Sequence, residues 1–92
     1  MFIIEDDLHA EWQKGEHPTL DAALDELRKR AKLPWDESPN RAPCMSWRTC
    51  GRMYVIVEFD TSSTPWRELR RLPILEVTAN GADWLYSPGL ET

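Results

Sequence analysis

The sequence predicts an α+β fold in which one amphipathic helix packs on a mainly antiparallel sheet of three or four strands. Three observations support this class: an apolar stripe with helical spacing after Thr19, an alternating pattern from Met53 to Asp60, and an Asn80-Gly81 pair between two apolar runs. The chain has 92 residues, of which 41% are hydrophobic and 29% charged, so it has room for one core. We therefore expect a single domain over residues 1–92 with the element order β-α-β-β-β.

The first predicted strand is short and runs from Phe2 to Glu5, where β-branched and aromatic residues are followed by acids. Residues 6–17 are ambiguous. Their apolar positions, among them Leu8 and Trp12, alternate as in a strand, yet the same stretch also suits a helical turn. Gly15 ends whichever element forms.

The helix is the clearest local signal. Thr19 is a good N-cap because its hydroxyl can accept a free backbone N–H, and Pro34 ends the helix near Leu33. Acids come early and bases late in this stretch, which complements the helix dipole. The stripe expected to face the sheet comprises Leu20, Ala23, Leu24, Leu27 and Ala31.

Two stretches are expected to be irregular. Residues 34–43 contain three prolines and several turn-forming residues, so they should form a loop. Trp35 lies in that loop and is expected to fold back onto the core. Residues 87–92 follow the last predicted strand and should form a frayed tail.

Met53–Asp60 has the most regular strand pattern in the chain. Because successive side chains of a strand point to opposite faces, one set of alternate residues should pack under the helix. The set that we expect to face the helix consists of Met53, Val55, Val57 and Phe59.

The last two strands should form a hairpin. One runs from about Leu69 to Thr78 and contains Pro73, which indicates an edge position or a bulge. Asn80-Gly81 favours a type I′ turn, whose two central residues need positive φ. With these two residues as the loop, Val77 lies opposite Trp84. The three strands after the helix would then be an antiparallel meander.

Charge and composition exclude several classes of function. The net charge of −5 argues against broad nucleic-acid binding, which depends on lysine and arginine contacts to phosphates. No run approaches the roughly 20 apolar residues of a membrane span. No leader sequence is recognisable, and two cysteines are too few for a disulfide framework, so we expect a cytoplasmic protein.

The charges are unevenly spread along the chain. Acids dominate from Glu5 to Glu26, whereas bases gather later. The simpler interpretation is that opposite charges meet inside the fold. A second interpretation is that the acidic segment acts as a decoy for a basic protein partner.

The two cysteines, Cys44 and Cys50, lack the spacing of a zinc knuckle or a redox pair, so no metal and no cofactor is expected. An alternative is a thiol-dependent enzyme or redox-sensitive protein. It would centre on Cys50, activated by a nearby arginine, with His9 or His17 as the base. Without a catalytic motif in the chain, we favour a protein that is not an enzyme.

Tryptophan is the most unusual feature, with five residues in 92. Tryptophan and arginine are preferred anchors in binding sites, and several of them adjoin in the second half of the chain. We therefore hypothesise a non-enzymatic module that binds a protein or a small acidic ligand. The expected contact residues are Trp47, Arg48, Arg52, Trp66, Arg67, Arg70 and Arg71. A homodimer formed through a free sheet edge is an alternative association.

Overall fold

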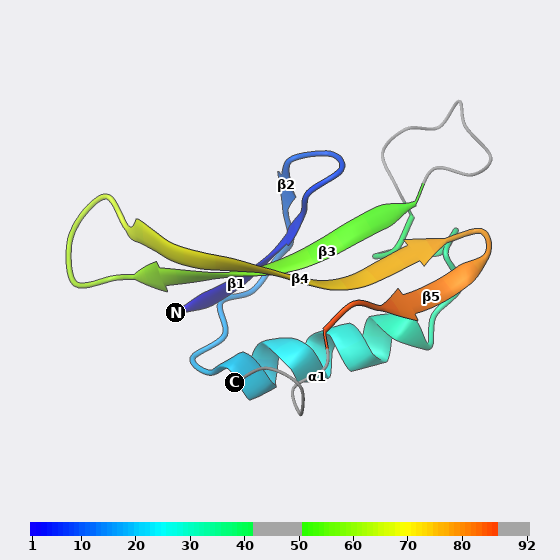
Figure 1. Cartoon of the computed structure of the whole chain (residues 1–92), viewed down its shortest axis with the longest axis horizontal. Coiled ribbons are helices and arrows are strands. Elements are labelled where there is room, and N and C mark those ends of the chain that lie inside the picture. Colours follow the sequence, from blue (N-terminus) through cyan, green and yellow to red (C-terminus); the bar gives the residue numbers. More distant parts are fainter. Residues whose placement is uncertain (42–50, 87–92) are drawn as a thin grey trace.

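The computed structural model describes residues 1–41 and 51–86, which form one helix and one sheet (Figure 1). The sheet has five antiparallel strands in the order β2-β1-β3-β4-β5. Along the chain the elements are β1 (Phe2–Asp6), β2 (Glu11–Trp12), α1 (Leu20–Ala31), β3 (Arg52–Asp60), β4 (Arg67–Thr78) and β5 (Gly81–Trp84). The predicted α+β class is confirmed, with one strand more than the expected maximum.

The additional strand, β2, lies within the stretch that the sequence left ambiguous. A turn at residues 7–10 reverses the chain, and Trp12 then pairs with Glu5 of β1. Ala10 adopts positive φ (50°) in that turn. Because β2 is only two residues long, it is too short to show a period in the sequence.

Helix α1 begins and ends close to its predicted limits. The Thr19 hydroxyl accepts the backbone N–H of Ala22 at 3.1 Å, and Lys32 is the C-cap. The predicted stripe faces the sheet, with Ala23, Leu24 and Leu27 buried. Within residues 1–41 and 51–86, no helix has the length and apolar character needed to cross a membrane.

The helix packs on the face of β3 opposite to the one we expected. The core cluster under α1 contains Tyr54 and Ile56, not the alternate set that includes Val55 and Val57. Val55 and Val57 are also buried, with 3% and 0% of their surface exposed. The prediction was wrong because this central strand is apolar on both faces, so alternation could not show which face the helix covers.

The β4–β5 hairpin forms with a different register from the predicted one. Ala79 and Asn80 make the turn, and Leu75 pairs with Trp84 while Val77 pairs with Ala82. The register is therefore shifted by two residues. Asn-Gly also suits a turn in which Asn is the last turn residue and Gly follows with positive φ. Gly81 does so, with φ of 120°.

Pro73 lies at an irregularity of the ladder, as the sequence indicated. Tyr54 of β3 pairs with Leu75 and the next residue, Val55, pairs with Pro73, so Ile74 is an extra residue in β4. Strand β5 pairs only with residues 75–78 of β4, so among the described strands Pro73 has a partner on its β3 side alone. The position is therefore both a bulge and a local edge. Trp35 packs against the core cluster, as expected.

We predict that the helix–sheet contact dominates stability. Leu27→Ala should lower the free energy of unfolding by about 2–5 kcal/mol, because it leaves a cavity in the fully buried core. Urea denaturation followed by circular dichroism measures this change. Leu33→Ala, at a residue 39% exposed, is the control and should cost much less. Equal losses in the two variants would contradict the prediction.

Candidate functional site

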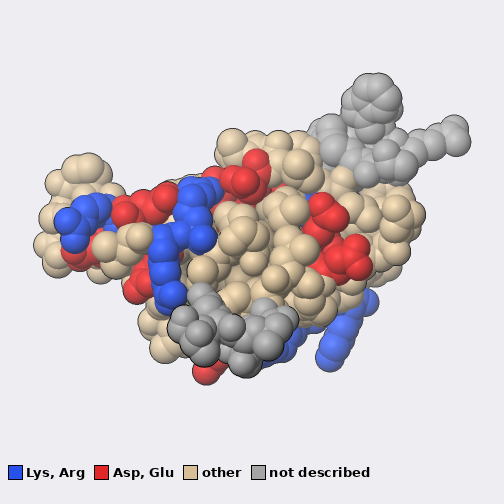
Figure 2. Space-filling model, in the orientation of Figure 1, with Lys and Arg blue, Asp and Glu red and all other residues tan. Residues whose placement is uncertain are grey.

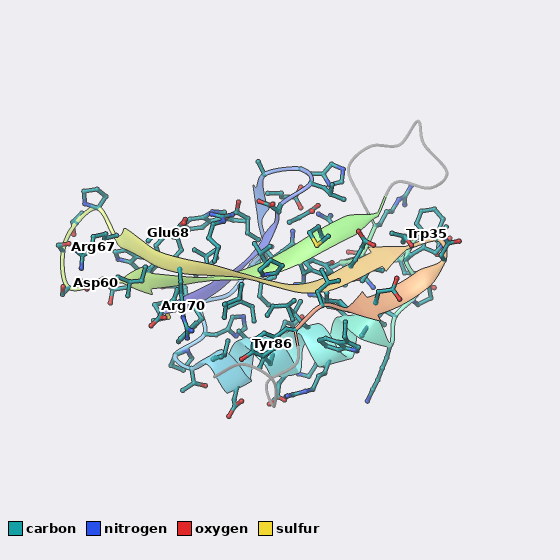
Figure 3. The ribbon with its side chains drawn as sticks, in the orientation of Figure 1. Trp35, Asp60, Arg67, Glu68, Arg70 and Tyr86 are labelled. Atoms are coloured by element: carbon teal, nitrogen blue, oxygen red, sulfur yellow. The ribbon has the colours of Figure 1, made fainter. Side chains whose placement is uncertain are left out.

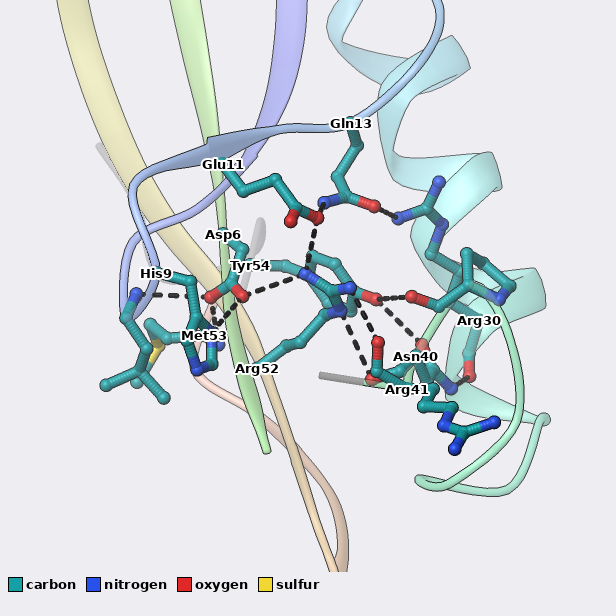
Figure 4. A network of polar contacts seen from close by, with 12 residues as sticks. Asp6, His9, Glu11, Gln13, Arg30, Asn40, Arg41, Arg52, Met53 and Tyr54 are labelled. Carbon is teal, nitrogen blue, oxygen red and sulfur yellow. Dashed lines mark hydrogen bonds and ion pairs between the residues drawn. The ribbon is translucent and has the colours of Figure 1, made fainter. Parts of the chain in front are cut away.

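An ion pair is buried where β1, β2 and β3 meet (Figure 4). Arg52 Nη1 donates to Asp6 Oδ2 at 2.9 Å, and the Asp6 side chain is fully buried. Asp6 Oδ1 also accepts the backbone N–H groups of Leu8 and Met53, each at 3.1 Å. Through Oδ2 the carboxylate balances the positive charge of Arg52, and through Oδ1 it holds the turn after β1 in place.

The Arg52 guanidinium joins this pair to the segment that follows the helix. Its Nε donates to the carbonyl oxygen of Asn40 (3.2 Å) and its Nη2 to that of Arg41 (2.7 Å). Its Nη1 also contacts Glu11 Oε1 at 2.8 Å. All three nitrogens are therefore in use, and one side chain connects β1, β2, β3 and residues 40–41.

Asn40 lies between the end of the helix and the sheet and is fully buried. Its Nδ2 donates to the carbonyl oxygens of Arg30 (2.8 Å) and Leu33 (3.2 Å), which lie at the helix C-terminus, where the last carbonyl groups lack the usual partner four residues on. Its Oδ1 accepts the Tyr54 hydroxyl at 2.8 Å. Burial raises the pKa of Tyr54, which keeps the hydroxyl protonated as a donor.

Arg30, in the last turn of α1, is a buried cation that sequence reasoning missed. Its Nε contacts Glu26 (2.9 Å), its Nη1 donates to Gln13 Oε1 (2.8 Å), and its guanidinium lies 5.1 Å from the Tyr54 ring centroid. The available signal was its position three residues after Leu27, beside the apolar stripe.

A cavity of about 510 Å³ opens beside this network. It lies within the 300–1,000 Å³ range of small-molecule sites. Positive groups dominate its lining, which includes Lys14, Arg30, Arg41 and Arg52, and Glu11 is the one acidic residue among the described residues that line it. Lys14 and Arg41 take part in no ion pair within the part of the chain that the structure describes.

The hydrogen bond from Gln13 to Glu11 lowers the pKa of this carboxylate, and the contact with Arg52 lowers it further. Glu11 is thus ionised at neutral pH, and it shares the Arg52 guanidinium with Asp6. The cavity is consequently positive although the chain is acidic overall. Such an arrangement can bind an anion.

The predicted arginines of β4 lie elsewhere, on the part of the β3–β4 hairpin that we call the distal arm (residues 58–71). Figure 2 shows basic and acidic side chains next to each other there, and Figure 3 shows Arg67, Arg70, Asp60 and Glu68 on this arm, far from Trp35. Each arginine contacts carboxylates. The pairs are Arg67 with Asp60 (3.4 Å), Arg70 with Glu58 (2.7 Å), and Arg71 with Glu5 and Glu68 (both 2.8 Å).

Hydrogen bonding strengthens the charged state of two members of these pairs. The Ser62 hydroxyl and backbone N–H lower the pKa of Asp60, which keeps it ionised beside Arg67. The hydrogen bond to Glu5 raises the pKa of Arg71. The charges of these arginines are therefore partly neutralised within the chain, whereas Lys14 and Arg41 pair with no carboxylate among residues 1–41 and 51–86.

The predicted contact residues do not all meet. Arg52 begins β3, whereas Arg67 pairs with its last residue, about 26 Å away at a strand rise of 3.3 Å. Arg70 and Arg71 pair with Glu58 and Val57, closer to the middle of the strand. Trp66 contacts Phe59 with ring centroids 5.9 Å apart, and Phe59 contacts Trp12 at 5.6 Å. Two further predicted contact residues, Trp47 and Arg48, lie outside the described residues.

The alternatives built on cysteine stay predictions, because Cys44 and Cys50 lie outside the described residues. Of the two histidines considered as the base, His9 is held by Asp6 Oδ2 at 2.5 Å from its Nδ1, and His17 pairs with Phe2 through the backbone. In the described ranges, no three His, Cys, Asp or Glu side chains gather as metal ligands would.

No protein-family model matches this chain, and searches of curated proteins and of solved structures found no significant match. Function must therefore be inferred from the side chains themselves.

We predict that the buried pair is essential for stability. Asp6→Ala should lower the free energy of unfolding by about 3–5 kcal/mol, because it leaves Arg52 buried with part of its charge uncompensated. Urea denaturation measures the loss. Asp7→Ala, at the adjacent and exposed carboxylate, should change stability by less than about 1 kcal/mol. A similar cost for both variants would contradict this role of Asp6.

We also predict a contribution of Glu11 to acid sensitivity. A carboxylate whose pKa is lowered by folding stabilises the protein above its ordinary pKa, and that stabilisation is lost as the pH falls through the lowered value. Between about pH 5 and 3, the stability of Glu11→Gln should therefore fall less steeply than that of the wild type. Urea midpoints across this range provide the measurement. Glu16→Gln, at an exposed residue, is the control, and identical slopes in both variants would refute the prediction.

Proposed function

We propose that this chain is a non-enzymatic binding module that takes an acidic ligand, or an acidic group of a protein, into the cavity between β2, the end of α1 and residues 38–41. The observation that carries the proposal is the positive lining of this cavity in a chain of net charge −5. Charges in a concave site attract the opposite charge more strongly than the same charges on a flat surface.

The polar network supports the proposal because it holds the cavity in shape before a ligand arrives. Arg52 and Asn40 connect the sheet to the segment that carries Arg41, and Gln13 connects β2 to Arg30. Side chains that are already ordered lose less entropy on binding. In this proposal Arg52 is a positioning residue, because its nitrogens are already engaged inside the protein.

The contact residues predicted from the sequence suggest a second location for the same function. The distal arm carries Trp66, Arg67, Arg70 and Arg71, but its arginines contact carboxylates of the same chain. An incoming anion would have to compete with those carboxylates. Lys14 and Arg41 have no such competitor among the described residues, so we favour the cavity.

The test compares the two locations directly. A capped penta-glutamate peptide, benzoate and inorganic phosphate are titrated into ¹⁵N-labelled protein, and binding is followed by NMR. We expect shifts at the indole N–H of Trp12 and the Nε–H of Arg30, and at least a tenfold weaker affinity in the double variant Lys14→Gln/Arg41→Gln.

The matched control is Arg67→Gln/Arg70→Gln, which removes the same amount of charge from the distal arm. It should leave the affinity for each probe unchanged. A loss of binding in the arm variant alone would place the site on the arm. The absence of any shift at the cavity with all three probes would refute the proposal.

A further inference from the structure

The charged side chains around the cavity indicate how many negative charges its ligand carries. Arg52 is shared between two carboxylates, Asp6 and Glu11, and Arg30 pairs with Glu26. Lys14 and Arg41 form no ion pair among the described residues, so a ligand with two negative charges can pair with both of them. A carboxylate brings one negative charge, whereas a phosphate monoester carries about −1.5 to −2 at neutral pH. The two cations without an ion pair in the described ranges therefore favour the phosphate monoester.

The side chains that line the cavity also match phosphate in their hydrogen-bonding character. Lys14, Arg30, Ser38 and Arg41 can all donate. Arg30 has 6% of its side chain exposed, and two of its nitrogens are fixed by Glu26 and Gln13. Three phosphate oxygens accept several such donors at once, and arginine suits this geometry.

Trp12 adds an apolar surface at the border of the same cavity. Its ring is supported by Phe59, with centroids 5.6 Å apart and planes tilted by 49°. It nevertheless keeps 57% of its surface exposed. A supported but exposed indole can stack on a planar group of a ligand.

We propose that the cavity selects a small dianionic phosphate monoester, with the phosphate held by Lys14, Arg30 and Arg41 and a planar group against Trp12. This inference rests on the function proposed above and narrows its ligand class. The oxygen-rich phosphate would lie over the cationic lining, and the ring would cover the indole at the edge of β2.

The experiment uses three probes that separate charge from shape. Phenyl phosphate carries two charges, phenyl sulfate has nearly the same shape with one charge, and benzoate has the same ring with a carboxylate. Isothermal titration calorimetry at pH 7.5 should show phenyl phosphate binding about tenfold more tightly than either of the others. The advantage should shrink at pH 5, below the second ionisation of the phosphate near pH 6.

Two variants test the roles of the residues. Arg41→Gln should abolish the preference for phenyl phosphate over phenyl sulfate. Trp12→Leu should weaken phenyl phosphate about tenfold and leave inorganic phosphate unchanged, whereas Trp84→Leu, at an indole 47% exposed on β5, should change neither. Circular dichroism confirms that each variant is folded.

The outcomes distinguish the two proposals. Equal affinity for the three probes, or the same preference in Arg41→Gln, would refute the selection of a phosphate monoester and leave anion binding in the cavity intact. Loss of inorganic phosphate binding in Trp12→Leu would refute the stacking role of the indole. Absence of binding by any of these anions, including the penta-glutamate peptide, would refute both proposals.

Discussion

The buried contact between Asp6 and Arg52 is the interaction on which the rest of the site depends. The two residues are 46 positions apart in the chain and meet at the ends of β1 and β3. Burying a guanidinium is costly unless nearly every N–H finds an acceptor, and Arg52 meets this need with two carboxylates and two backbone carbonyls. Those carbonyls belong to residues 40 and 41, so compensating this one charge also determines where the chain runs after the helix.

The position of Asn40 then follows. Its Nδ2 donates to carbonyl oxygens at the end of α1, and its Oδ1 accepts a hydrogen bond from the Tyr54 hydroxyl. Asn40 therefore connects the helix C-terminus to the central strand of the sheet. Arg30 extends the same network to Gln13 beyond β2. The cavity lies between these connected parts, and its positive lining combines the structural residues Arg30 and Arg52 with Lys14 and Arg41.

Most of the acidic side chains near the start of the chain form ion pairs with bases of the same chain. From Glu5 to Glu26 there are eight acids, and six of them contact basic side chains: Glu5, Asp6, Asp7, Glu11, Asp25 and Glu26. This distribution supports the interpretation that opposite charges meet within the protein and leaves little free acid in that segment for a decoy role. It also explains how an acidic chain can present a positive cavity.

The sequence by itself determined the α+β class, the limits of α1 and the strands that follow it, because caps, helical spacing and turn residues act over a few neighbouring positions. Alternation along β3 did not show which face meets the helix, since both faces are apolar, and an Asn-Gly pair suited two hairpin registers. Only the tertiary structure decided those points and brought Asp6, Arg30, Asn40 and Arg52 together. Contacts between residues so distant along the chain leave no period or local pattern, so the candidate site could not be read from it.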